Sequence, residues 1–310
     1  MPLLDLFNLT GGLSPCQVLC YNSTMIIRDI PRDYTVDAPR PGSITKIEYD
    51  NGREKKYALV YLPYSYDEKE KYDILYLIHG GGGRQEDYFG DMEYSTRFKK
   101  SIDQLMERKE LRPIIIVSAT VYGKDHDRDS RMDSWRAVKE FISEVDGFLM
   151  PAVEGTFSTY APTIDREGFI ASRMHRSFGG FSMGSVTTWY MFLDKLQYFS
   201  TFIPMSGDCW VIERRGGRTR PKETVAALYE AAKKRGYTKD DFRICAVTGS
   251  EDKAREGLIN MLDAMKEYKE AFDMRDTGNT ALYIREGGVH EMKYVKQYLF
   301  NVLPVLFPGK

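Results

Sequence analysis

The sequence predicts an α/β fold in which a mostly parallel central sheet is covered by helices on both faces. Short apolar runs alternate with helical stretches over most of the chain, as they do where crossover helices join parallel strands. The apolar runs are continuous, which is typical of strands buried on both sides. At 310 residues, with 42% hydrophobic residues, the chain is long enough for one large domain with a sizeable core.

The chain has one soft boundary near its start. A proline-rich stretch, residues 37–42, follows the first part of the sequence, and such stretches favour irregular structure. We therefore expect residues 1–40 to form an N-terminal extension and residues 41–310 to form a single α/β domain. No repeat or low-complexity tract divides that domain.

The domain opens with two predicted antiparallel strands. Residues 44–49 and 57–62 alternate apolar and polar side chains, which is typical of half-buried strands. The Asp-Asn-Gly-Arg stretch between them suits a hairpin turn. The sequence therefore predicts an antiparallel N-terminal edge on the sheet.

The remaining elements alternate along the chain. Continuous apolar runs predict buried strands, and amphipathic stretches between them predict helices. The predicted strands are 74–79, 114–119, 176–181, 202–205, 243–247 and 281–284, and the predicted helices are 95–108, 134–150, 184–197, 222–235, 254–273 and 291–306.

Composition argues against several kinds of partner. Lys+Arg 44 against Asp+Glu 45 leaves a net charge of -1, so no overall positive field favours nucleic acid or an anionic membrane. The first residues include Asp5 and lack a cationic start, so neither a signal peptide nor a membrane span is predicted. A cytoplasmic chain or a secreted chain without its leader both fit. Cys16 and Cys20 could pair, but the four cysteines match no zinc-binding spacing.

The most informative motif is Gly180-Phe-Ser182-Met-Gly184, which fits G-x-S-x-G. It lies at the end of a predicted strand and opens a predicted helix, which is the context that the motif requires. The serine must sit on a tight turn with its Oγ exposed, so its neighbours must be small. A glycine-rich turn that only connects two elements is the alternative, but the context favours a nucleophile at Ser182.

A run of four glycines, residues 80–83, directly follows His79 and the strand 74–79. An α/β-hydrolase places at this point the loop that donates a backbone N–H to the oxyanion. A phosphate-binding loop is the alternative, but no G-K-[ST] ending accompanies the glycines. His79 belongs to the strand end and precedes the serine, so we expect it to be structural.

The candidate base follows from chain order, because triads of this fold run from Ser to Asp or Glu to His. The histidines are His79, His126, His175 and His290, and of these His290 alone follows Ser182. It lies in a loop between the last predicted strand and the last predicted helix. A lone loop histidine is often a solvated surface group, but its position and order favour a base.

The candidate acid must lie between these two residues. Asp252 follows the buried strand 243–247 directly and is our choice. Glu251 is its adjacent competitor. Asp208 is a second choice, because it too follows a strand, and two such acids can coexist when one of them shapes the pocket.

Five ordered segments carry a family resemblance: LYLIHGGGG, HRSFGGFSMGSVTTWY, PMSGDCW, TGSED and GGVHE. Together they resemble the esterase D-like carbohydrate esterases, the feruloyl esterases and acetyl xylan esterases that accompany xylanases. The resemblance covers about residues 40 to 310 and implies an α/β-hydrolase fold. It is less specific for substrate, because S-formylglutathione hydrolases, mycolyltransferases and enterochelin esterases are similar in fold and triad.

Transferred residue by residue, the resemblance implies Ser182 as nucleophile, Asp252 as orienting acid and His290 as base. It implies an oxyanion hole made of the backbone N–H groups of Met183 and of a glycine, Gly81 or Gly82. The implied reaction is acyl transfer to water, which needs no metal or organic cofactor.

The implied activity is that of a serine esterase acting on feruloylated or acetylated xylan or its oligosaccharides. A feruloyl esterase that releases ferulic or p-coumaric acid is the first expectation, and an acetyl xylan esterase is the second. A small-ester hydrolase resembling S-formylglutathione hydrolase and a non-catalytic carbohydrate-binding module are the remaining alternatives. The oligomeric state is left open.

Two residues near the predicted active-site mouth are candidates for substrate binding. Trp210 offers an aromatic face for a phenolic acyl group or a sugar, and Asp208 lies two residues before it. The basic stretch 214–220 that follows is interpreted as a solvated loop rather than as an anion site.

Overall fold

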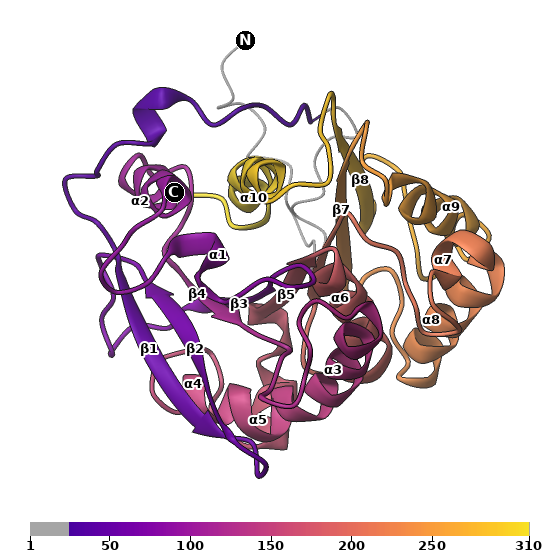
Figure 1. Cartoon of the computed structure of the whole chain (residues 1–310), viewed down its shortest axis with the longest axis horizontal. Helices are drawn as coiled ribbons and strands as arrows, with labels where there is room; N and C mark the ends of the chain where they lie inside the picture. Colours follow the sequence, from indigo (N-terminus) through magenta and orange to yellow (C-terminus); the bar gives the residue numbers. More distant parts are fainter. Residues whose placement is uncertain (1–24, 310) are drawn as a thin grey trace.

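An eight-stranded sheet runs through the whole domain (Figure 1). The computed structural model describes residues 25–309, so the first 24 residues of the expected extension and the Cys16–Cys20 pair lie outside the described part. The strand order is β1-β2-β4-β3-β5-β6-β7-β8. The pairings β1–β2 and β2–β4 are antiparallel and all the others are parallel. The predicted mostly parallel sheet with an antiparallel N-terminal edge is confirmed.

The strands lie within two residues of their predicted positions, whereas the helices differ more. No helix of the described part has both the length and the apolar character needed to cross a bilayer. The strands are β1 Ser43–Asp50, β2 Lys55–Leu62, β3 Asp73–Ile78, β4 Ile114–Ala119, β5 Arg176–Phe181, β6 Thr201–Met205, β7 Arg243–Gly249 and β8 Thr280–Arg285, and the helices are α1 Glu86–Phe89, α2 Arg97–Glu107, α3 Arg131–Glu144, α4 Met150–Glu154, α5 Arg166–Ala171, α6 Met183–Lys195, α7 Gly216–Thr219, α8 Pro221–Lys234, α9 Arg255–Met265 and α10 Met292–Leu306, with a π-helical turn at Val145–Leu149 and 3₁₀ turns at Arg32–Tyr34 and Arg173–His175.

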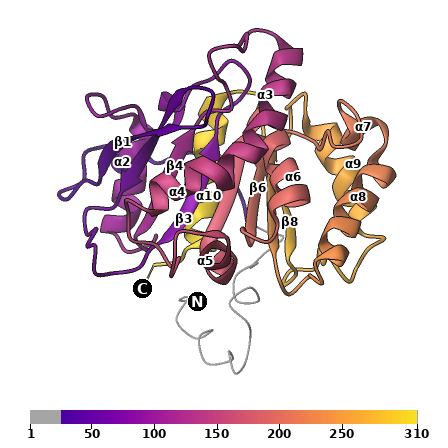
Figure 2. The ribbon, with the colours of Figure 1, turned by 90° about the horizontal axis from the view of Figure 1, so that it is seen from below.

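Each buried strand contributes side chains to two cores, one on each face of the sheet. Along β3, Tyr76 packs into one core while Leu75 and Leu77 pack into the other, because successive strand residues point to opposite faces. Helices α3, α4, α5, α6, α8 and α9 cover the first face, and α1, α2 and α10 cover the second (Figures 1 and 2). This double cover explains why the strands are continuously apolar in sequence.

The described segment before β1 packs against the second helix layer. Ile27 is buried in the core that α10 lines, and the Tyr34 ring meets Phe300 of α10 edge to face at 5.0 Å. Arg108, just after α2, pairs with Asp33 at 2.8 Å. This segment therefore covers part of α2 and α10.

A fully buried ion pair holds the start of β5, the strand that leads to Ser182. The Arg176 guanidinium donates two hydrogen bonds of 2.8 Å to the two carboxylate oxygens of Glu154, and both side chains are at most 1% exposed. Tyr76 and Thr159 hydroxyls also donate to this carboxylate, each at 2.9 Å. Every charge in this cluster is thus compensated by polar partners.

Replacing Glu154 by alanine should destabilise the fold by about 3 to 5 kcal/mol, because it leaves the Arg176 charge buried without its counterion. Urea unfolding measures this loss. Glu267→Ala is the matched control, because it breaks the exposed Lys222–Glu267 pair and should cost less than about 1 kcal/mol. Equal effects of the two substitutions would contradict the prediction.

Candidate active site

The predicted site residues follow strands that lie side by side in the sheet. The glycine run follows β3, Ser182 follows β5, Asp252 follows β7 and His290 follows β8. Because these strands are parallel, their carboxyl ends share one edge of the sheet, where open α/β folds bind their ligands. The topology therefore brings together residues that are far apart in sequence.

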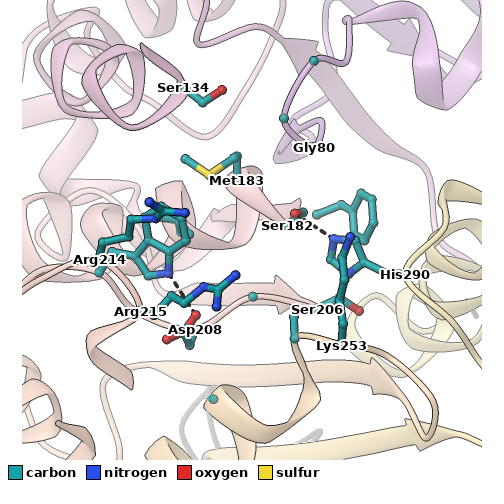
Figure 3. Close-up of a pocket in the computed structure, with 18 of the residues that line it drawn as sticks. Gly80, Ser134, Ser182, Met183, Ser206, Asp208, Arg214, Arg215, Lys253 and His290 are labelled. Carbon is teal, nitrogen blue, oxygen red and sulfur yellow. Dashed lines mark hydrogen bonds between the residues drawn. The ribbon is translucent and has the colours of Figure 1, made fainter. Parts of the chain in front are cut away.

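Ser182, His290 and Asp252 form a hydrogen-bonded chain, and Figure 3 shows its bond between Ser182 and His290. His290 Nε2 lies 2.9 Å from Ser182 Oγ, and His290 Nδ1 lies 2.8 Å from Asp252 Oδ1. Because an ionised carboxylate can only accept, Nδ1 carries the proton and Nε2 is free to take one from the serine. Such an arrangement can activate a hydroxyl nucleophile.

Asp252 is buried, and its environment keeps it ionised. Burial alone would raise the pKa of its carboxyl group, but hydrogen bonds from His290 and from the Ala254 N–H outweigh burial and hold that pKa below its ordinary value. The Ala254 N–H donates to Oδ1 at 2.7 Å. A negative charge is therefore fixed beside Nδ1 of the imidazole.

Ser182 sits on a strained turn between β5 and α6, with φ 54 and ψ −107. Two glycines make this turn feasible. A Cβ on Gly180 would lie 2.6 Å from the backbone of Gly184, and a Cβ on Gly184 would overlap the carbonyl oxygen of Ile78. Any side chain at these positions would push the turn away from β3, so the G-x-S-x-G spacing has a steric cause.

The proposed oxyanion donors differ in availability. Met183 begins α6, where backbone N–H groups have no partner within the helix. The Gly82 N–H instead donates to the hydroxyl of Tyr122 at 2.9 Å. Of the three predicted donors, Met183 and Gly81 therefore remain as proposed donors, and Gly82 fixes the loop.

Tyr122 is a site residue that sequence reasoning missed. Its hydroxyl also lies 2.7 Å from Ser134 Oγ, and its ring stacks on the His79 imidazole with centroids 5.6 Å apart. It follows the end of β4, the parallel neighbour of β3. That position was the available signal, because loops at the carboxyl ends of adjacent parallel strands meet.

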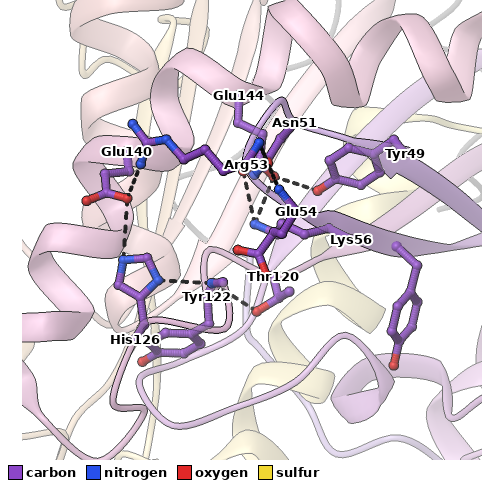
Figure 4. Close-up of polar contacts among 12 residues, drawn as sticks. Tyr49, Asn51, Arg53, Glu54, Lys56, Thr120, Tyr122, His126, Glu140 and Glu144 are labelled. Atoms are coloured by element: carbon purple, nitrogen blue, oxygen red, sulfur yellow. Dashed lines mark hydrogen bonds and ion pairs between the residues drawn. The ribbon is translucent and has the colours of Figure 1, made fainter.

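A cluster of polar side chains contacts the loop that carries Tyr122 (Figure 4). These side chains line a small cavity of about 120 Å³. His126 Nδ1 accepts from the Gly123 N–H at 3.0 Å, and the Glu54 carboxylate accepts from the Lys124 N–H at 2.9 Å. A buried Lys56–Glu144 pair of 2.8 Å lies in the same cluster. Glu54 of the β1–β2 hairpin thus holds the loop that carries Tyr122, and Glu140 of α3 lies 3.6 Å from His126 of that loop.

His79 is structural, as expected, and it is held in the neutral state. Its Nδ1 lies 2.7 Å from the Gly80 carbonyl oxygen and its Nε2 lies 2.7 Å from Thr120 Oγ1. A carbonyl can only accept, so Nδ1 carries the proton and Nε2 accepts from the threonine. Burial lowers the pKa of the His79 imidazole to about 4.

This lowered pKa predicts a pH-dependent stability. The unfolded imidazole takes up a proton near pH 6.5, whereas in the folded protein the pKa of His79 is about 4. Between these values the unfolded state binds more protons, so lowering the pH should remove about 3 kcal/mol of stability. Unfolding measured at several pH values for wild type and His79→Gln isolates this contribution. An unchanged pH slope in the variant would contradict it.

A pocket of about 600 Å³ opens above Ser182 and His290, and both predicted substrate-binding residues line it. The Trp210 ring meets Trp135 edge to face, with centroids 6.1 Å apart. Tyr190 links the two, because its hydroxyl accepts from Trp135 Nε1 at 3.1 Å and donates to the Trp210 carbonyl at 2.9 Å. Trp210 thus forms a fixed aromatic wall of the pocket that Ser182 also lines.

Asp208 lines the pocket but points its carboxylate at its own loop. Oδ1 accepts from Trp210 Nε1 at 2.9 Å, and Oδ2 accepts from the Arg218 N–H at 3.1 Å. Burial raises the pKa of this carboxyl group. Glu251, the other competitor for the acid, is exposed. Of the three candidate acids, Asp252 contacts His290.

Within residues 25–309, no three His, Cys, Asp or Glu side chains lie close enough together to hold a metal ion.

Known proteins match this sequence over nearly its whole length. Residues 52–305 match the family Esterase, described as "Putative esterase". The chain is 32% identical over 299 residues to endo-1,4-beta-xylanase Y of Acetivibrio thermocellus, a match that covers 95% of this chain and 26% of that protein. It is 26% identical over 161 residues to an endo-1,4-beta-xylanase/feruloyl esterase of Xylanibacter ruminicola, covering 50% of this chain and 20% of that protein. The matches therefore span about a quarter or less of these two relatives.

Solved structures resemble this one in their fold. A serine-to-alanine mutant of the feruloyl esterase module from Clostridium thermocellum, complexed with sinapinate, has a TM-score of 0.81 at 34% identity and covers 92% of this chain and 95% of that one. A ferulic acid esterase from Anaeromyces mucronatus in complex with ferulic acid has a TM-score of 0.63 at 16% identity, covering 88% of this chain and 94% of that one. The predicted α/β-hydrolase fold is confirmed.

Proposed function

The chain belongs to the Esterase family, and from that premise we propose that it is a serine carboxylic ester hydrolase that releases ferulic or p-coumaric acid from feruloylated xylan. The single observation that carries the chemistry is the chain of two hydrogen bonds, 2.9 and 2.8 Å long, that joins Ser182, His290 and Asp252. Carboxylic ester hydrolysis as the class of reaction agrees with the feruloyl esterase module at 34% identity.

The proposed mechanism has two acyl-transfer steps. His290 Nε2 takes the proton of Ser182 as Oγ attacks the ester carbonyl, and the Met183 and Gly81 N–H groups hold the developing oxyanion. The alcohol leaves with that proton, and an acyl-enzyme remains. Water then attacks the acyl group with His290 again as the base, while Asp252 fixes the tautomer and stabilises the imidazolium.

The aromatic wall supports a hydroxycinnamoyl acyl group. Trp210 borders the pocket beside Ser182 and is held by Asp208, Tyr190 and Trp135. A fixed indole face favours stacking with a phenolic ring at a low cost in conformational entropy. The related feruloyl esterase module binds sinapinate, which agrees with an aromatic acyl group here.

Three alternative functions are considered: two are hydrolases with other substrates, and the third is a non-catalytic binding module. An acetyl xylan esterase would use the same residues and leave the aromatic wall to the sugar. A small-ester hydrolase fits the likeness in fold to the S-formylglutathione hydrolase from Staphylococcus aureus, which has a TM-score of 0.57 at 16% identity. A carbohydrate-binding module would need no proton path from Ser182 to His290.

Relative activity on two esters tests the proposal. We expect kcat/KM to be higher on methyl ferulate than on 4-nitrophenyl acetate, after subtraction of the Ser182→Ala background, because this ratio reports discrimination between acyl groups in the transition state. Activity on acetate alone would move the assignment to acetyl xylan or small-ester hydrolysis. If the protein hydrolyses neither ester and a fluorophosphonate does not label Ser182, the non-catalytic carbohydrate-binding module would be the remaining assignment.

A further inference from the structure

Cationic side chains surround the active-site pocket. Its lining contains five Arg or Lys residues and two Asp residues. Arg214 and Arg215 come from the loop after β6, and Lys253 comes from the loop after β7. Figure 3 shows the Arg215 side chain extending into the space between Asp208 and His290. The basic stretch 214–220, which was interpreted as a solvated loop, thus contributes three arginines to the pocket lining, Arg214, Arg215 and Arg218.

Of the acidic groups nearby, Glu256 and Asp208 are engaged elsewhere, whereas Asp129 lines the pocket from the loop after β4. Glu256 pairs with Arg218 at 2.7 Å, and the Asp208 carboxylate accepts from Trp210 and from the Arg218 backbone. No ion pair within residues 25–309 uses Arg214, Arg215 or Lys253. A pocket wall with one excess sign of charge favours ligands of the opposite sign and raises their local concentration.

The loop that carries the two arginines has a defined backbone. Arg215 has φ 61, a left-handed conformation that costs free energy for any residue except glycine. The Gly217 N–H donates to the Cys209 carbonyl at 2.8 Å, and a Cβ on Gly217 would lie 2.8 Å from the Cβ of Asp208. The Arg214 guanidinium lies over the Trp210 ring, 5.9 Å from its centroid. Packing of the loop therefore holds both arginines at the pocket that Ser182 also lines.

We propose that Arg214, Arg215 and Lys253 form a subsite for a carboxylate carried by the ester substrate. A guanidinium matches a carboxylate with two parallel hydrogen bonds. The acidic side chain beside the two arginines, Asp208, already accepts from Trp210 and from the Arg218 backbone. The carboxylate belongs either to the alcohol, as a uronic acid on the sugar, or to the acyl group, as in a half-ester of a dicarboxylic acid. This inference rests on the proposed ester hydrolysis at Ser182 and specifies its substrate class.

Two matched pairs of esters distinguish the sources. The first pair is an acetylated aldouronic oligosaccharide and its carboxyl-reduced counterpart, which differ in charge on the alcohol. The second pair is 4-nitrophenyl hemisuccinate and its methyl ester, which differ in charge on the acyl group. In wild type we expect kcat/KM to be about tenfold higher for the charged member of at least one pair.

Variants show whether the arginines cause this preference. Arg214→Gln/Arg215→Gln should reduce the charge preference, which is the ratio of kcat/KM for the charged and neutral members of a pair, to about twofold or less. Lys222→Gln/Lys233→Gln on α8 is the control, because it removes the same net charge outside the pocket lining. A preference that survives the arginine substitutions, or that falls equally in the control, would overturn the proposal.

Binding to Ser182→Ala separates this inference from the proposed reaction. Calorimetric titration of this variant with the same four esters measures affinity without turnover. About tenfold tighter binding of a charged member, lost on adding the two arginine substitutions, would support the subsite even if Ser182 were not the nucleophile. Equal affinities within both pairs, together with equal kcat/KM values, would overturn it.

Discussion

Replacement of Ser182 by alanine is expected to lower kcat by about 10⁴- to 10⁶-fold. The proposed nucleophile, the Oγ that lies 2.9 Å from His290 Nε2, is then absent, so the proposed acyl-enzyme cannot form. The Met183 and Gly81 N–H groups remain in place, and the residual rate should equal what an oxyanion hole and binding give alone. Steady-state hydrolysis of 4-nitrophenyl acetate with freshly purified variant measures this loss.

A neighbouring serine provides the control for this substitution. Ser185 lies one turn further along α6 and donates its hydroxyl to the Gly207 carbonyl at 2.7 Å. Ser185→Ala should lose some stability and keep kcat within about tenfold, because its hydroxyl has no part in the proton path. If Ser182→Ala kept activity within the same range, another group would have to be the nucleophile.

Replacement of Asp252 by asparagine is expected to lower kcat by about 10³- to 10⁴-fold, with a similar fold and little change in KM. Asparagine can still accept from the Ala254 N–H, as Asp252 Oδ1 does at 2.7 Å. It removes the negative charge that stabilises the imidazolium, and its amide allows the wrong tautomer of His290. Rates over a range of pH, measured beside circular dichroism, separate this effect from misfolding.

Asp208→Asn is the matched comparison, because Asp208 was the second candidate for the same role. Its carboxylate contacts Trp210 and the Arg218 backbone, so its neutralisation should loosen the aromatic wall. We expect KM for aromatic esters to rise and kcat to stay within about tenfold. A larger loss of kcat in Asp208→Asn than in Asp252→Asn would reverse the assignment of the acid.

The sequence predicted the central strands well because β3, β4, β5 and β7 are buried along their whole length. The strand β4, Ile114–Ala119, is apolar in five of six positions, and its two ends coincide with the ends of the apolar run in the sequence. Helix ends were harder to predict. The stretch 254–273 was expected to be one helix, but α9 ends at Met265, and Ala271 and Phe272 reach the core from a turn instead. Periodicity cannot distinguish these two routes to burial.

Short helices and their caps account for most of the remaining differences. α3 begins at Arg131, three residues before its predicted start, because the Ser130 side chain accepts from the Asp133 N–H, as an N-cap residue does. α1, α5 and α7 have six residues or fewer, which is too short to show a helical period. Such elements form where tertiary packing supports them.

The site divides in a similar way. Ser182, Asp252 and His290 were predictable because chain order and strand ends determine where they lie. The engagement of the Gly82 N–H by Tyr122 was not predictable from order, because it depends on how two loops pack. The same holds for Arg214 and Arg215, whose placement depends on the left-handed backbone at Arg215 and on Gly217 packing against Asp208.

The sequence separation of the three proposed catalytic side chains affects the order in which the active site forms during folding. Ser182 and His290 are 108 positions apart, and His290 becomes available only when β8 has joined the edge of the sheet beside β7. Contacts across such sequence separations form late, because closing long loops costs entropy before any contact compensates for it. In a partly folded chain whose β8 has not yet joined the sheet, Ser182 is therefore expected to be inactive. Trp189 lies on α6 in the core of the first sheet face. During refolding, we expect this tryptophan to become buried before hydrolysis recovers, because hydrolysis also requires the last strand to dock.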